Sequence, residues 1–224
     1  GMIVVSIFGV MLLHLVISGV LAHRRIYKDL FRYRKGGTGQ QANIDLHYRF
    51  SVLGLPFHIM IAITGAFFGM FSIFSAITAN VTHQGDETQL IEDIYGGDPI
   101  VTSSATRDVV AGFEHLYKMN PEAKPIYIVV HNMGKANEFY EIAATLPRRL
   151  IYSEIYRYQS DGTYIDQQGF ENGSAGRQVI YSIYRLHFGR FDSYWIKTSY
   201  FILGISLALI CVSGINIWLN RRGY

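Results

Sequence analysis

The sequence predicts a mainly α-helical membrane protein with three transmembrane helices and one α+β domain outside the bilayer. Two observations predict this fold class. Three stretches of the 224-residue chain contain no Asp, Glu, Lys or Arg, namely residues 2–22, 50–82 and 198–220. Each is long enough to cross a hydrocarbon core of roughly 30 Å as a helix. The chain from residue 85 to residue 190 is instead rich in charged residues, Gly and Tyr, as expected of a domain folded in water.

The first predicted transmembrane helix covers residues 2–23. A signal peptide would open with basic residues, whereas here His23, Arg24 and Arg25 follow the apolar run. The next segment, residues 24–46, is a basic loop, and the tail 221–224 is also basic. By the positive-inside rule both lie in the cytoplasm, which puts the α+β domain in the periplasm of a bacterium and the chain in its inner membrane. A first helix that enters from outside without a preceding charge also suggests an earlier span.

The second predicted transmembrane helix covers residues 47–79, and the third, with the segment leading into it, covers residues 184–220. Between them, residues 80–183 form the predicted α+β domain. Ser103 or Ser104 is expected to cap a helix over residues 107–119, where apolar residues recur at helical spacing. Strands are predicted over residues 125–131, 138–144, 150–158 and 163–166, with a hairpin turn at Asp161-Gly162.

No catalytic motif is visible in this domain. It contains no nucleophile elbow, Gly-rich phosphate loop or paired catalytic carboxylates, and without a basic stripe no nucleic-acid partner is expected. The domain is therefore interpreted as a sensor, clamp or spacer. The single cysteine, Cys211, lies in the third span, which excludes a disulfide framework and a cysteine metal cluster.

Histidines in the membrane segments carry the functional hypothesis. Five of the eight lie in or beside the spans: His14, His23, His47, His58 and His187. Ionisable residues inside a bilayer are costly and mark functional sites, and imidazole is an axial ligand of haem iron. On an ideal helix the 11 residues from His47 to His58 correspond to about 20° in azimuth and about 16 Å in rise, although Pro56 can kink the helix. Both rings would then face one groove at two depths.

The depth at which each histidine lies in the membrane suggests which histidines pair. His23 and His47 lie at the same cytoplasmic depth, and His58 pairs with His187 on the outer side if the third helix begins near Ser182. His14 is a rival partner for His58, but its nine-residue spacing from His23 puts the two about 180° apart, and it is discarded. A simple hydrogen bond to a neighbouring helix is the alternative role for any single membrane histidine. His83, His115 and His131 lack metal-ligand spacing and are read as structural.

Several motifs resemble those of the PepSY-associated transmembrane family. They are SGVLAHRRIYKDLF at residues 18–31 with Arg34, DLH at 45–47, LGLPFH at 53–58 with Thr64-Gly65, LHFGRF at 186–191, YFILG at 200–204 and Ser213-Gly214. The helix and hairpins of the soluble part are similar to a PepSY domain. Members of the family usually have four or more spans, and some resemble ferric-siderophore reductases or iron-regulated uptake proteins.

The resemblance implies two haem b groups with His23, His47, His58 and His187 as axial ligands. The first functional hypothesis is therefore an electron carrier in the lipid bilayer that reduces ferric siderophores or serves other uptake components, with its electron donor left open. Its class as an enzyme, a ferric-siderophore reductase-like oxidoreductase, is an expectation only. The second hypothesis is a non-enzymatic, membrane-anchored PepSY module that regulates a protease or an uptake partner.

Overall fold

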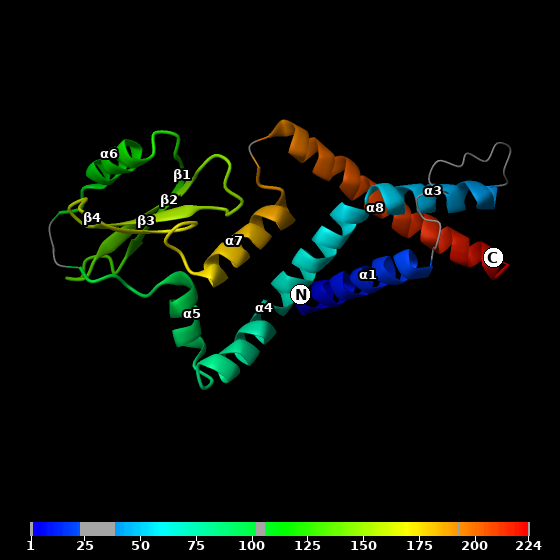
Figure 1. Ribbon diagram of the computed structural model, residues 1–224, viewed down its shortest axis with the longest axis horizontal. Helices are drawn as coiled ribbons and strands as arrows, with labels where there is room; N and C mark the ends of the chain where they lie inside the picture. The colour runs from blue at the N-terminus through cyan, green and yellow to red at the C-terminus, as the bar shows by residue number, and fades with distance from the viewer. Residues whose placement is uncertain (1, 23–38, 102–105, 192, 224) are drawn as a thin grey trace. The chain divides into compact units, whose positions relative to one another are not determined.

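The computed structural model describes residues 2–22, 39–101, 106–191 and 193–223 (Figure 1). The chain divides into two compact units, each described by itself below. The membrane unit comprises residues 1–72 and 186–224, and the sheet unit comprises residues 73–185.

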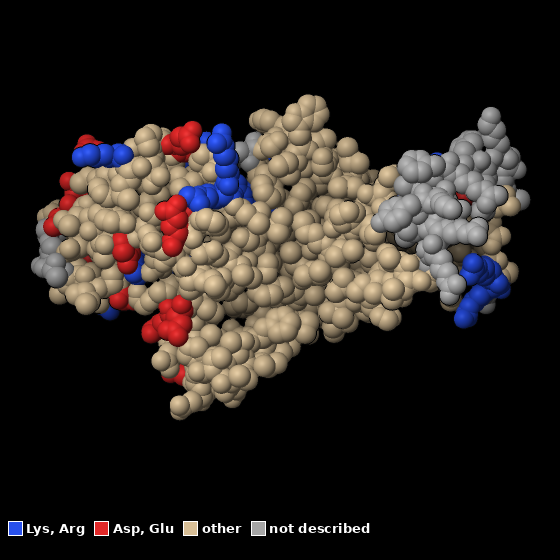
Figure 2. All heavy atoms as spheres, viewed as in Figure 1, with Lys and Arg blue, Asp and Glu red and all other residues tan. Residues whose placement is uncertain are grey.

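Among the described residues, the membrane unit contains α1 (Met2–Ala22), α3 (Gly39–Leu53), the first part of α4 (Leu55–Thr82), α8 (Tyr194–Arg221) and the last residues of α7 (Ala175–Phe188). Within the described residues, three segments are long and apolar enough to cross a membrane: Ile3–Ala22, Leu55–Thr82 and Tyr194–Arg221. Figure 2 shows a broad surface without charged side chains over these helices, and basic side chains near the C-terminal end of α8. The prediction of a mainly helical membrane protein with three spans is confirmed.

Small residues bring α1 and α4 together. A side-chain carbon added at Gly9 of α1 would lie 3.1 Å from the Ala66 nitrogen and 3.3 Å from the Ala62 oxygen of α4. Ala62 is almost fully buried, as is Ser6 one turn before Gly9. Small residues at membrane helix interfaces allow this close backbone approach, which strengthens dispersion contacts between helices.

The second predicted span differs from the structure at its start. Helix α3 begins at Gly39, within the segment predicted as a loop, because hydropathy reveals only the apolar part of a helix and α3 opens with polar residues. A break at Gly54 then separates α3 from α4. Pro56 explains the break, since it has no N–H to donate and is tolerated in the first turn of a helix.

The sheet unit holds a four-stranded antiparallel sheet in the order β1-β2-β3-β4. Its described elements are the end of α4, α5 (Glu87–Tyr95), α6 (Val109–Met119), β1 (Lys124–His131), β2 (Phe139–Thr145), β3 (Glu154–Gln159), β4 (Tyr164–Gln168) and most of α7. Leu116 of α6 packs into a core with Tyr140, Ile142, Tyr156 and Tyr158 of the sheet. The predicted helix and four strands are all present, while α5 and α7 come in addition.

Two helix boundaries differ from expectation. The N-cap of α6 is Asp108, whose carboxylate accepts from the Ala111 N–H, so the expected cap at Ser103 or Ser104, which lie outside the described residues, is wrong. The third span does not begin near Ser182. Helix α7 ends at Phe188, followed by Gly189 with a φ of 58°, and α8 starts at Tyr194. His187 therefore lies on α7, a separate helix.

Candidate functional site

A cavity of about 780 Å³ lies between α1, α3, the start of α4 and α8 in the membrane unit. Its wall is mostly apolar, and His47 and His58 both line it. Asp45, Tyr48 and Arg221 add further polar groups to the lining. The volume falls within the roughly 300–1,000 Å³ of small-molecule and cofactor sites, which combine apolar walls with a few placed polar groups. The expectation that the two histidines face a common space therefore agrees with the structure.

His47 is held by α8. Its Nδ1 lies 3.0 Å from the Ile210 carbonyl oxygen and 3.1 Å from the Ser213 hydroxyl oxygen. The ring also lies against Gly214, where an added side-chain carbon would stand 3.2 Å from Cε1. Because Nδ1 is occupied, Nε2 is the nitrogen left to bind a ligand.

His58 is the most deeply buried of the membrane histidines that the structure describes, with 2% of its surface exposed. Its Nε2 lies 3.3 Å from the Ser206 hydroxyl oxygen of α8. A side-chain carbon added at Gly54 would stand only 2.3 Å from Cε1 of the ring. The glycine at the break between α3 and α4 thus provides the space that the ring fills.

His187 projects from α7 onto α4. Its Nδ1 lies 2.9 Å from the Thr64 hydroxyl oxygen, and its ring makes an edge contact with Phe68 at 5.5 Å between centroids. An added carbon at Gly65 would lie 3.2 Å from Cε1.

The structure does not test the predicted pairing. His23 lies outside the described residues, so the inner pair with His47 stays a prediction. Among the described residues that line the cavity, His47 and His58 are present and His187 is not, so the outer pair also stays a prediction. His14 is exposed on α1.

The three histidines of the sheet unit have other neighbours. His83 Nε2 lies 2.8 Å from Asp93, His115 stacks on Tyr164, and His131 stacks on Phe139. Within the described part of the chain no group of three or more His, Cys, Asp or Glu side chains could hold a metal ion.

Three hydroxyl residues of the site were not predicted from the sequence: Thr64, Ser206 and Ser213. Each is at most 4% exposed and contacts one membrane histidine from a facing helix. For two of them the sequence contains an indication, because Ser206 and Ser213 are seven residues apart and so share one face of an otherwise apolar helix. The sequence alone did not show which of the Ser and Thr residues of the spans meet histidines.

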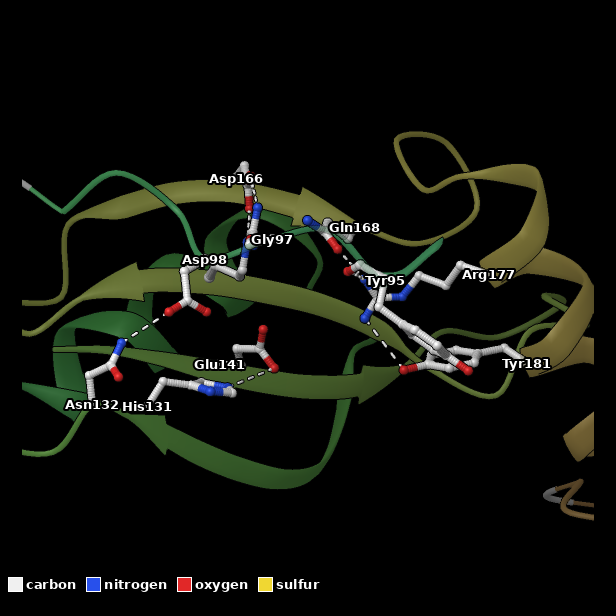
Figure 3. A network of polar contacts seen from close by, with 11 residues as sticks. Tyr95, Gly97, Asp98, His131, Asn132, Glu141, Asp166, Gln168, Arg177 and Tyr181 are labelled. Atoms are coloured by element: carbon white, nitrogen blue, oxygen red, sulfur yellow. Dashed lines mark hydrogen bonds and ion pairs between the residues drawn. The ribbon is translucent and has the colours of Figure 1, made fainter. Parts of the chain in front are cut away.

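A separate network of polar contacts lies in the sheet unit (Figure 3). Arg157 of β3 donates to both carboxylate oxygens of Asp166, at 2.6 and 2.5 Å, and to the Gly97 carbonyl oxygen. Arg177 of α7 is 4% exposed and donates to Gln168 and to the Tyr95 carbonyl oxygen. These groups hold α5, α7 and the sheet together.

Fold and cavity together define a class: a polytopic membrane protein whose helices present histidines to an interhelical cavity, joined to an α+β domain. Residues 1–221 match the family model described as the PepSY-associated TM region. The chain belongs to this family, so the resemblance seen in its motifs is confirmed. It is also similar to a protein of Pseudomonas aeruginosa named "Uncharacterized protein PA4219", with 25% identity over 236 residues. The alignment covers 99% of the chain and 60% of that relative, so the chain spans about three-fifths of the relative's length.

Proposed function

We propose that this protein is a haem b-binding electron carrier of the bacterial inner membrane that reduces ferric siderophores in the periplasm for iron uptake. The observation that carries the proposal is the cavity between α1, α3, the start of α4 and α8, with two histidines on its wall. Bound haem would supply reversible one-electron chemistry, and the protein would set its position and potential.

The residues of the cavity fit a haem group. The wall is largely apolar, as a porphyrin face requires. Because Nδ1 of His47 is hydrogen-bonded to α8, its Nε2 is the nitrogen left to bind iron. Arg221 at the end of α8 also lines the cavity, and an arginine is a suitable partner for a propionate carboxylate. His23 and His187 complete the proposed set of four axial ligands for two haem groups.

The chemistry of the substrate is a one-electron reduction. A donor in the cytoplasm or a quinol gives up one electron, and one ferric ion of the chelate takes it and becomes ferrous. Siderophore oxygens are hard ligands that hold the harder ferric ion more tightly than the ferrous ion, so reduction releases the metal. In this account the described helices hold the carriers in place, and the sheet unit faces the periplasm.

A second candidate function is supported by the edge of the sheet. Strand β1 ends the described sheet, and its apolar residues Ile126, Tyr127, Ile128 and Val129 are each 37–40% exposed. An edge strand of this kind can pair with an added strand of another protein. On this account the sheet unit regulates a protease or an uptake partner, and the spans anchor it.

Anaerobic reoxidation tests the first proposal. The full-length protein in nanodiscs would be reduced with dithionite, freed of reductant and mixed with a ferric siderophore and a ferrous-specific chelator. We expect reoxidation of the haem band with one ferrous ion released per electron. The His14→Ala variant, altered on an exposed face of α1, should react as the wild type does, whereas a His47→Ala/His58→Ala variant should not. A reduced protein that stays reduced in excess chelate would contradict the proposal.

A further inference from the structure

The hydrogen-bond partners of the membrane histidines differ in a way that matters for metal binding. A hydroxyl group has one hydrogen, so a hydroxyl that already donates to a carbonyl can only accept from a second neighbour. The Thr64 hydroxyl donates to the Met60 carbonyl oxygen at 2.7 Å. The nitrogen 2.9 Å away, Nδ1 of His187, must then carry the hydrogen and donate it to Thr64.

The same reasoning applies to His47. The Ser213 hydroxyl donates to the Leu209 carbonyl oxygen at 2.7 Å, and the Ile210 carbonyl oxygen can only accept. Nδ1 of His47 therefore donates to two acceptors on α8. In a neutral imidazole with a hydrogen on Nδ1, the lone pair is on Nε2.

His58 has the opposite arrangement. The Ser206 hydroxyl donates to the Leu203 carbonyl oxygen at 2.7 Å, so Nε2 of His58 donates to Ser206 and the lone pair is left on Nδ1. Nδ1 lies next to the Cβ attachment and is the more hindered nitrogen, whereas Nε2 extends furthest from the backbone. A flat macrocycle thus reaches Nε2 more easily.

We infer that Thr64 is a positioning residue that fixes the tautomer of His187 so that Nε2 is offered to iron, with Ser213 and Ile210 doing the same for His47. Ser206, in contrast, engages Nε2 of His58, so His58 binds iron through Nε2 only once this contact is broken. The inference rests on the proposed function, since it concerns how the same histidines bind haem. Thr64 and Ser213 thus prepare a histidine for iron, whereas Ser206 links two helices.

Two substitutions that each remove one interhelical histidine contact test the inference. Thr64→Val keeps the size and branching of the side chain but removes the acceptor. Outer-sphere partners of this kind contribute about 10–100-fold to metal affinity, so we expect the haem held through His187 to bind that much more weakly. The reduction potential of that haem should rise, because an imidazole without an acceptor at Nδ1 is a weaker donor to ferric iron. Thr64→Ser should restore both values.

Ser206→Ala is the matched contrast, since it also removes a bond between a histidine and a hydroxyl. It should not lower haem affinity, because it frees Nε2 of His58. Ser213→Ala should have a smaller effect than Thr64→Val, since the Ile210 carbonyl oxygen remains. Thr78→Val, at an exposed position of α4, controls for the loss of a threonine hydroxyl. Equal losses of haem affinity in Thr64→Val and Ser206→Ala would overturn the inference and leave helix linkage as the role of both.

A second measurement needs no haem. In the haem-free, full-length protein labelled with ¹⁵N-histidine, ring-nitrogen shifts report which nitrogen carries the hydrogen. We expect Nδ1–H for His47 and His187 and Nε2–H for His58, with the His187 signal altered in Thr64→Val. An Nε2–H tautomer at His187 would overturn the inference even in a protein that binds haem. If the wild type binds no haem, the proposed function fails, and the shifts still decide the tautomers.

Discussion

Each of the three described membrane histidines that contact a facing helix lies against a glycine. The space at these glycines differs, and a side-chain carbon there would stand 2.3 Å from the His58 ring at Gly54 but 3.2 Å from the His187 and His47 rings at Gly65 and Gly214. Real side-chain carbons essentially never approach within 3.0 Å, so a methyl group at Gly54 must displace a ring that is 2% exposed. Close packing in the interior leaves no free volume for that shift.

Gly54→Ala should therefore displace His58 and cost about 1–3 kcal/mol of stability, the usual range for overpacking a core. Haem content and the thermal unfolding midpoint of the purified protein measure this. Gly204→Ala is the matched control, because nothing lies within 4 Å of the added carbon in that membrane helix. Similar results for the two variants would show that the ring is not confined as described.

The membrane histidines could be predicted from the sequence, but their hydrogen-bond partners could not. The histidines were visible because an ionisable residue in an apolar run is conspicuous. Their partners were not, because Thr64, Ser206 and Ser213 resemble ordinary polar residues until facing helices meet. The nitrogen that each ring presents depends on distances of about 3 Å between helices, and such distances have no periodicity in the sequence.

At the scale of elements, the sheet is built on buried tyrosines. Burial raises the pKa of Tyr140 to about 12, and it raises the pKa values of Tyr156 and Tyr158 as well. A raised pKa in the folded state favours the neutral phenol. The resulting stability is fully present below the unfolded pKa of about 10 and is lost as the pH rises through about 12.

We accordingly expect the sheet unit to unfold as the pH rises from 10 toward 12, with a cooperative increase in tyrosinate absorbance. Tyr140→Phe removes the hydrogen bond to the Asp108 carbonyl oxygen and should cost about 1 kcal/mol at neutral pH. Since the variant has no phenol to ionise there, its stability deficit should shrink above pH 10. A deficit that stays constant with pH would contradict this role for Tyr140.

The ion pair between β3 and β4 gives a second prediction at this scale. Arg157 is 7% exposed, and Asp166→Ala would leave its guanidinium without its carboxylate. We expect a loss of about 2–4 kcal/mol, somewhat below the value for a fully buried pair because Asp166 is partly exposed. Hydrogen exchange of the β3 amides measures the loss. Glu171→Ala breaks the exposed pair with Arg149 and should cost less than about 1 kcal/mol.

Element boundaries were predicted where the sequence contains a local signal. The hairpin at Asp161-Gly162 was predicted correctly, since Gly162 adopts a φ of 84° that favours glycine. The start of α3 was missed because a hydropathy profile detects only the residues that contact lipid. Helix α3 opens with polar residues, which form a helix without this signal. The end of α7 was missed because its apolar and polar residues run on toward α8 without a proline, and the left-handed conformation of Gly189 lies just after the end of α7.

At the scale of the whole molecule, the three spans could be predicted from charge distribution, because a bilayer excludes charge along a length of about 20 residues. The α+β nature of the segment between them had to come from the periodicity of its apolar residues. Orientation can be tested by labelling. In a Cys211→Ser background, which removes the single cysteine, Lys135→Cys in an exposed turn should react with an impermeant maleimide in intact spheroplasts. Arg222→Cys should react only after the membrane is opened. The reverse pattern would put the sheet unit in the cytoplasm and remove it from periplasmic chelates.

An absorbance spectrum of the purified full-length protein shows whether the membrane histidines hold haem. We expect a b-type haem band after reduction with dithionite, retained in His14→Ala and lost in the His47→Ala/His58→Ala variant. A wild-type protein that remains colourless after haem is supplied during expression would contradict the proposed haem binding.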